Sequence, residues 1–193
     1  NTKVVAANKA GNSKGYQRSA AAGNGPGVAS RPGIRYTAYP FILCLVVYPP
    51  ACPMTQISLK ITEIFYSLQG EARTVGLPTV FVRLTGCPLR CQYCDSEYAF
   101  YGGERMALEA ILAQVAAYKP RYVCVTGGEP LAQAGCLPLL TSLCDAGYDV
   151  SLETSGAMSV QEVDSRVARV IDLKTPGSGE VNRNLWENME SLS

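Results

Sequence analysis

Three cysteines, Cys87, Cys91 and Cys94, fall within one short stretch of the chain. Thiolates at such close spacing can converge on a single soft metal centre. A closed zinc site needs four ligands, and the sequence contains no histidine to supply the fourth. A 4Fe-4S cluster normally takes four thiolates, so three would leave one iron open to a substrate or cofactor. The spacing therefore favours a catalytic iron-sulfur cluster over one that only transfers electrons.

A zinc site completed by a distant thiol is the alternative. Cys124, Cys136 and Cys144 could each supply the fourth ligand. All three lie at apolar positions of predicted strands or helices, where a cysteine typically acts as a small buried hydrophobic residue.

The Cys-x3-Cys-x2-Cys pattern follows an apolar run at residues 79–84 and resembles the signature of the radical S-adenosylmethionine (SAM) enzymes. The resemblance implies a 4Fe-4S cluster on Cys87, Cys91 and Cys94. It also implies that SAM binds the open iron and is cleaved there to a 5'-deoxyadenosyl radical. A reducing electron donor such as flavodoxin is expected as a partner.

A glycine-rich motif, Gly127-Gly128-Glu129, comes directly after another apolar run at residues 121–125. Glycines let the backbone approach a ligand closely, and a neighbouring carboxylate can accept from an ammonium group. The motif resembles the Gly-Gly-Glu motif of radical SAM enzymes, which implies that Gly128 and Glu129 bind the amino group of SAM. An ordinary glycine turn is the alternative.

Further polar residues lie at predicted strand ends and beside the third cysteine. Glu153 and Ser155 are expected to bond the SAM ribose, unless they only form a solvated strand end. Asp95 is better suited to capping a helix or loop than to binding a ligand, and a surface ion pair is the alternative for Asp172 and Lys174. The complete set of expected SAM contacts is Tyr93, Asp95, Glu153, Ser155, Asp172 and Lys174.

A narrower resemblance rests on Leu68-Gln-Gly-Glu71, Arg83, Gly86-Cys-Pro88 and Cys94-Asp-Ser96. Together they resemble the 7-carboxy-7-deazaguanine synthase family, from residue 54 to about 188. The resemblance implies a cytoplasmic, homodimeric lyase of queuosine precursor biosynthesis. Such an enzyme contracts 6-carboxy-5,6,7,8-tetrahydropterin to 7-carboxy-7-deazaguanine with loss of ammonia. The alternatives are another radical SAM enzyme, such as a glycyl-radical activase that acts on a protein, and an inert Fe-S fragment.

The same resemblance assigns residues to the substrate. Arg83 offers a fixed two-pronged donor for the substrate carboxylate, unless it faces solvent. Gln69, with the backbone of Leu68 and Gly70, is suited to the donor-acceptor edge of the pterin. Thr126 is the remaining expected substrate contact.

A magnesium ion is also implied, held in part by Ser96, two places after the third cysteine. Magnesium prefers oxygen ligands and keeps water or substrate in its shell, and a serine hydroxyl meets that preference.

Strands and helices alternate along the predicted core. Such alternation with short connections indicates a parallel sheet with helical crossovers. The polar motifs follow the carboxyl ends of four strands, so we expect them to meet at one site. We therefore predict a partial parallel (β/α) barrel of the radical SAM type, truncated at its C-terminus. The predicted strands are 57–61, 79–84, 121–125, 149–152 and 168–172, and the helices are near 108–115, 137–144, 159–162 and 181–191.

Composition separates the first 53 residues from the rest. Residues 1–53 carry six Lys or Arg and no Asp or Glu, whereas residues 54–193 carry eleven basic and sixteen acidic side chains. We expect 1–53 to be a non-native or disordered extension and 54–193 the radical SAM core. The net charge of +1 argues against a nucleic-acid partner. The apolar run 40–47 is shorter than the about 20 residues that span a bilayer, so no membrane is expected.

Overall fold

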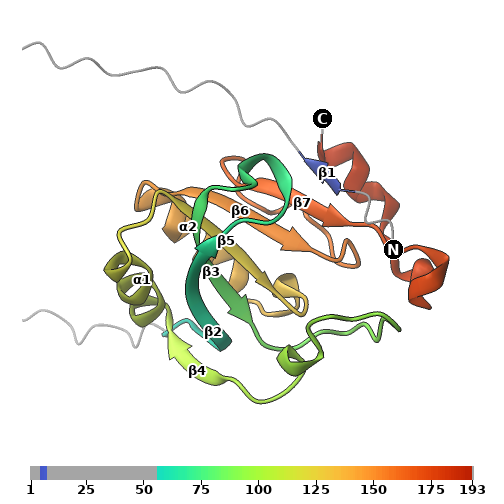
Figure 1. Ribbon diagram of the computed structural model, residues 1–193, viewed down its shortest axis with the longest axis horizontal. Helices are drawn as coiled ribbons and strands as arrows, with labels where there is room; N and C mark the ends of the chain where they lie inside the picture. The colour runs from blue at the N-terminus through green and yellow to red at the C-terminus, as the bar shows by residue number, and fades with distance from the viewer. Residues whose placement is uncertain (1–4, 8–55, 193) are drawn as a thin grey trace, which may run out of the picture. The chain divides into compact units, whose positions relative to one another are not determined.

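A seven-stranded mixed sheet is the framework of the computed structural model, which describes residues 5–7 and 56–192 (Figure 1). The strand order is β1-β7-β6-β5-β3-β2-β4, so β1 and β4 form the two edges and the sheet stays open. The strands are β1 (Val5–Ala7), β2 (Ser58–Leu68), β3 (Pro78–Leu84), β4 (Glu104–Ala107), β5 (Tyr122–Gly127), β6 (Asp149–Thr154) and β7 (Ala168–Asp172). The α-helices are α1 (Leu108–Ala117) and α2 (Cys136–Asp145).

Four of the strands, β3, β5, β6 and β7, are parallel to one another. The α1 helix lies between β3 and β5 in the chain, and α2 joins β5 to β6. This confirms the predicted partial (β/α) barrel. The other three strands, β1, β2 and β4, run antiparallel to their neighbours. The sequence analysis predicted a parallel sheet and did not anticipate these antiparallel pairs. The domain boundary expected at residue 53 lies outside the described residues, of which only Val5–Ala7 precede it.

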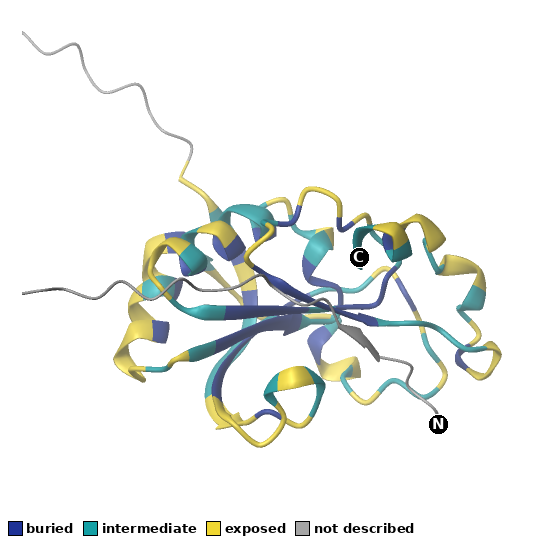
Figure 2. Cartoon of the chain, turned by 90° about the horizontal axis from the view of Figure 1, so that it is seen from above, coloured by how far each residue is buried: buried dark blue, intermediate teal, exposed yellow. Residues whose placement is uncertain are grey.

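The two faces of the sheet differ because successive side chains of a strand point to opposite sides. Alternate apolar residues, such as Val80, Val82, Val123 and Val125, pack with α1 and α2 in the buried core. Figure 2 shows this buried layer along the strands. The intervening positions carry Arg83, Thr126, Glu153 and Asp172, which line a cavity on the other face.

Two details of secondary structure differ from expectation at β2 and β4. The strand predicted at 57–61 continues to Leu68 through an irregularity between Ile61 and Glu63. The short β4 strand follows Gly103, where the sequence suggested only a chain break. Gly103 has a φ of 68°, which lets the chain turn back to pair with β2.

The helix predicted after Ser159 is wrong. Residues 159–167 form successive turns, closed by bonds from Val163 N to Val160 O and from Val167 N to Asp164 O. The hydroxyl of Ser159 accepts from Gln161 N instead of capping a helix. Val160 and Val163 are buried in this conformation, so the packing of these two side chains favours the turns over a helix.

The last described part of the chain contains short 3-10 helices. Within the predicted helix 181–191 lie η5 (Val181–Arg183) and η6 (Trp186–Leu192), separated by two residues. In the described residues no strand follows Asp172, as expected. Among all the residues that the structure describes, no helix is both long enough and apolar enough to cross a membrane.

Candidate functional site

A cavity of about 280 Å³ opens at the carboxyl ends of the four parallel strands. This confirms that the polar motifs of those strand ends meet at one place. Four of the expected site residues, Leu68, Gln69, Gly70 and Glu129, do not line the cavity. Those that line it are Arg83, Cys87, Cys91, Tyr93, Cys94, Asp95, Ser96, Thr126, Gly128, Glu153, Ser155, Asp172 and Lys174.

The cysteine loop begins after Gly86, whose φ of 99° turns the chain out of β3. All three thiols, of Cys87, Cys91 and Cys94, are free and partly exposed. Burial raises the pKa of Cys87 and of Cys91, and Lys174 opposes the shift at Cys91. No three acidic, cysteine or histidine side chains of the described residues are gathered as a preformed metal site. The thiols border one cavity as a soft donor set, which suits an iron-sulfur cluster.

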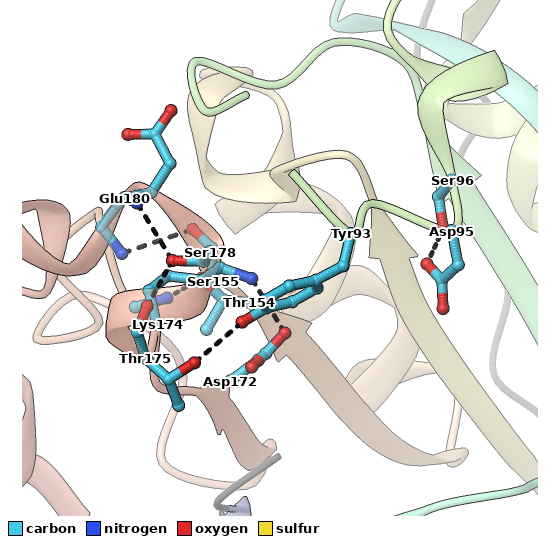
Figure 3. A network of polar contacts seen from close by, with 12 residues as sticks. Tyr93, Asp95, Ser96, Thr154, Ser155, Asp172, Lys174, Thr175, Ser178 and Glu180 are labelled. Carbon is cyan, nitrogen blue, oxygen red and sulfur yellow. Dashed lines mark hydrogen bonds and ion pairs between the residues drawn. The ribbon is translucent and has the colours of Figure 1, made fainter. Parts of the chain in front are cut away.

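A segment after β7, residues 174–180, lies against the cysteine loop (Figure 3). Tyr93 Oη and Thr175 Oγ1 are 3.3 Å apart, and Gln92 N donates to Ser178 O at 3.0 Å. Glu180 accepts from the backbone N of Arg90. No motif in the sequence predicts these contacts, because they depend on how two distant loops fold.

Asp172 and Lys174 form an ion pair of 2.9 Å at the cavity wall. The Lys174 side chain is only 10% exposed, so the surface ion pair considered above does not describe it. Burial is the largest single effect and lowers the pKa of Lys174, but the hydrogen bond to Asp172 together with the nearby negative charges outweighs it, so the pKa is raised. Lys174 therefore brings a stable positive charge beside the cysteine loop.

Glu129 differs most from its expected role. Its carboxylate is fully buried and accepts from Thr154 Oγ1 at 2.9 Å, Ser155 N at 2.8 Å, Ser155 Oγ at 2.5 Å and Leu131 N at 3.0 Å. Glu129 does not line the cavity, and its expected contact with SAM stays a prediction. The backbone of Gly127 and Gly128 lines the wall instead.

Gly128 occupies a position that only glycine fits. A Cβ added there would lie 2.4 Å from Gly86 O and 2.7 Å from Cys87 Cβ. The Gly-Gly turn is therefore pressed against the start of the cysteine loop, and the ordinary glycine turn is not a sufficient description.

Arg83 lines the cavity with a side chain that is 16% exposed, so it is not the solvent-facing arginine considered above. Its Nε donates to Glu63 Oε1 at 2.8 Å, and Tyr98 Oη donates to the same oxygen at 2.9 Å. The guanidinium also lies 5.7 Å from the centre of the Tyr98 ring. These contacts hold Arg83 by Nε and leave its two terminal nitrogens for another acceptor. Sequence reasoning missed both Glu63 and Tyr98.

Glu153 joins residues that were expected to have different tasks. Its two oxygens accept from Gln69 Nε2 and from Thr126 Oγ1, each at 3.1 Å. Gln69 is itself buried and lies behind Glu153. The expected SAM contact is thus linked to two expected substrate contacts.

Two oxygen-bearing side chains, Asp95 and Ser96, lie beside the cysteine loop. Ser96 Oγ donates to Asp95 Oδ1 at 2.8 Å, and both residues line the cavity (Figure 3). These are hard donors of the kind that magnesium prefers.

Comparison with known proteins gives the class of this site. Residues 81–175 match the family described as the radical SAM superfamily. The part of the chain that contains the cysteine loop and the Gly-Gly turn is thus similar to radical SAM domains, and such a domain implies a 4Fe-4S cluster and SAM.

The particular relatives are 7-carboxy-7-deazaguanine synthases. The chain is 47% identical to the enzyme of Chlorobaculum tepidum over 134 residues, which cover 69% of this chain and 61% of the relative. It is 45% identical to that of Koribacter versatilis over 137 residues, covering 70% and 61%. The crystal structure of QueE from Escherichia coli matches with a TM-score of 0.56 at 26% identity, covering 70% of this chain and 77% of that one. The chain thus spans about 61% of the length of the two curated relatives.

Proposed function

We propose that this chain provides the radical SAM core of a lyase that converts 6-carboxy-5,6,7,8-tetrahydropterin to 7-carboxy-7-deazaguanine with loss of ammonia. The similarity to 7-carboxy-7-deazaguanine synthases supports this substrate class. The observation that carries the proposal is the placement of Arg83, a fixed cation in the cavity that the three cysteines also border.

The residues present suit the cofactors. Cys87, Cys91 and Cys94 would hold the cluster, with one iron left for SAM. When bound, the cluster and SAM supply the one-electron chemistry that removes a hydrogen atom from the substrate. Gly127, Gly128 and Lys174 all line this cavity, and the glycine backbone and the charge of Lys174 would contact SAM.

Positioning of the substrate is the task of other residues that line the same cavity. The terminal nitrogens of Arg83 would bind the substrate carboxylate as a two-pronged donor. Glu153, which is already oriented by Gln69 and Thr126, would accept from N–H groups of the pterin ring. Because hydrogen abstraction by a radical is selective only through position, these two anchors would decide which carbon reacts.

The finer parts of the proposal rest on the family resemblance. Ser96, with Asp95 beside it, would provide oxygen ligands for magnesium. A reductant such as flavodoxin would supply the electron in the cytoplasm, and the working protein would be a homodimer.

The test is anaerobic turnover by protein reconstituted with iron and sulfide, with SAM, magnesium and a chemical reductant present. We expect 7-carboxy-7-deazaguanine from carboxy-tetrahydropterin, detected by mass spectrometry. A tetrahydropterin that lacks the carboxylate is the matched control and should yield no ring-contracted product. Equal turnover of both pterins would contradict the role given to Arg83, and radical formation on a protein substrate instead would contradict the proposed lyase.

A further inference from the structure

The buried carboxylate of Glu129 lies where three strand ends meet. Its backbone N donates to Gly86 O at 2.9 Å, at the start of the cysteine loop after β3. Its side chain binds Thr154 and Ser155 at the end of β6, and the residue itself follows β5. One residue therefore connects the cysteine loop, the Gly-Gly turn and the end of β6.

The chemistry of this junction is matched to a carboxylate. The contacts come from two hydroxyl groups and two backbone N–H groups, and all of them are donors. A carboxylate has only acceptors to offer them, and a buried charge is tolerated where hydrogen bonds satisfy it. A glutamine of the same size would turn an N–H group toward at least one of these donors.

The junction also fixes backbone that lines the cavity. Gly127 and Gly128 precede Glu129 directly, and Ser155 follows Thr154. The segments on both sides of the Glu129 hydrogen bonds therefore include residues that line the cavity. The backbone of Gly128 lies so close to Gly86 and Cys87 that no Cβ atom fits between them. A shift of Glu129 would therefore move the neighbouring backbone that lines the cavity, even if the Glu129 side chain touches no ligand.

We propose that Glu129 is a positioning residue for SAM: its buried carboxylate clamps the Gly-Gly turn to Thr154 and Ser155 and so holds the SAM-binding wall in shape. The inference rests on the SAM site of the proposed function but not on the pterin substrate. Failure of pterin turnover therefore leaves it standing, and its own failure leaves the substrate proposal standing.

The first measurement is SAM affinity of the anaerobically reconstituted full chain, by calorimetry. Glu129→Gln should keep its iron content and bind SAM about tenfold or more weakly, because a buried donor loses its acceptor. Thr154→Val removes one donor at nearly constant shape and should weaken SAM binding too, whereas Thr154→Ser should restore it. If Thr154→Val binds like the parent while Glu129→Gln does not, Glu129 acts as a direct ligand and the clasp is refuted.

The second measurement needs neither cluster nor SAM. Amide hydrogen exchange of the cluster-free chain should be faster at Leu131 or at Ser155 in Glu129→Gln, since these amides donate to different carboxylate oxygens and the glutamine amide replaces one of them with a donor. Leu140→Ala, a buried α2 change that does not touch the cavity, is the control for general destabilisation. It should lower the melting temperature and leave SAM affinity unchanged. Equal loss of SAM affinity in both variants, or unchanged exchange in Glu129→Gln, would overturn the proposal.

Discussion

At the residue scale, Arg83 illustrates how a charge is prepared for a ligand. Glu63 accepts from its Nε, and Tyr98 donates to the same Glu63 oxygen. Glu63 therefore holds the guanidinium through Nε, and Arg83 lines the cavity. A single rotatable ammonium group would keep the charge but lose this geometry.

Arg83→Lys should accordingly bind the pterin but turn it over poorly. We expect uncoupling, in which 5'-deoxyadenosine forms with little deazaguanine product, because the carbon to be attacked is no longer fixed. Arg83→Ala should bind weakly, since the substrate carboxylate loses its donors. The measurement is the ratio of product to 5'-deoxyadenosine. A parental rate and ratio in Arg83→Lys would exclude the carboxylate clamp.

The six described cysteines should divide by function. Anaerobic reconstitution should give about four irons per chain, and Cys91→Ala should abolish the cluster. Cys124→Ala, Cys136→Ala and Cys144→Ala should retain it, because these residues do not line the cavity. Iron analysis and the visible spectrum provide the readout. A colourless protein with one zinc would favour the zinc alternative.

Thiol reactivity should divide them in the same way. Burial raises the pKa of Cys136 to about 12 and that of Cys124 well above its usual value, so neither forms thiolate at pH 8. Iodoacetamide should therefore modify the three loop cysteines of the cluster-free native chain first. Mass spectrometry of the peptides shows the order, and labelling of Cys136 as fast as Cys94 would disagree with this structure.

At the scale of elements, the loops after β3 and β5 are fitted to each other through Gly128. Gly128→Ala places a methyl group against Gly86 O, an overlap that costs about 1–3 kcal/mol or displaces the loop. We expect lower thermal stability and loss of SAM binding. Gly177→Ala is the matched control, because nothing lies within 4 Å of its added Cβ. Calorimetry with SAM checks both, and parental affinity in Gly128→Ala would show that the loops move independently.

Element types were predictable where local pattern and packing agree. The runs at 79–84 and 121–125 are mostly apolar, as buried parallel strands are, and both formed. After Ser159 a local capping pattern competed with burial of Val160 and Val163, and burial won. The short β4 strand depends on pairing with β2, which lies far away in the sequence.

The site was predictable to the same extent. The strand ends that converge could be read from the sequence, because parallel strands share one carboxyl edge. The direction of the Glu129 carboxylate could not, since Thr154 and Ser155 become its partners only in the folded sheet. Glu63 and Tyr98 belong to no recognisable sequence motif. Only the fold brings Glu63 into contact with Arg83 and Tyr98 into contact with Glu63.

At the scale of the whole molecule, the parallel core and the cavity lie within residues 71–180. The β1 strand adds only an antiparallel edge along β7. A variant that starts at Met54 should therefore keep about four irons per chain after reconstitution. Iron content and melting temperature are the measurements, with the full chain as the control. Loss of the cluster in the shorter variant would mean that the first 53 residues support the site.

The segment at 174–180 has a consequence for the order in which the protein is made. Arg90 and Glu180, which meet through a hydrogen bond, are 90 residues apart in the sequence. During synthesis the cysteines leave the ribosome long before the chain that braces them, and domains fold only as their parts emerge. Until residues 174–180 emerge, the three thiols therefore lack the contacts of that segment and are exposed to oxidation. Iron-sulfur assembly on this chain would then be a late step, and it would need reducing surroundings until residue 180 has left the ribosome.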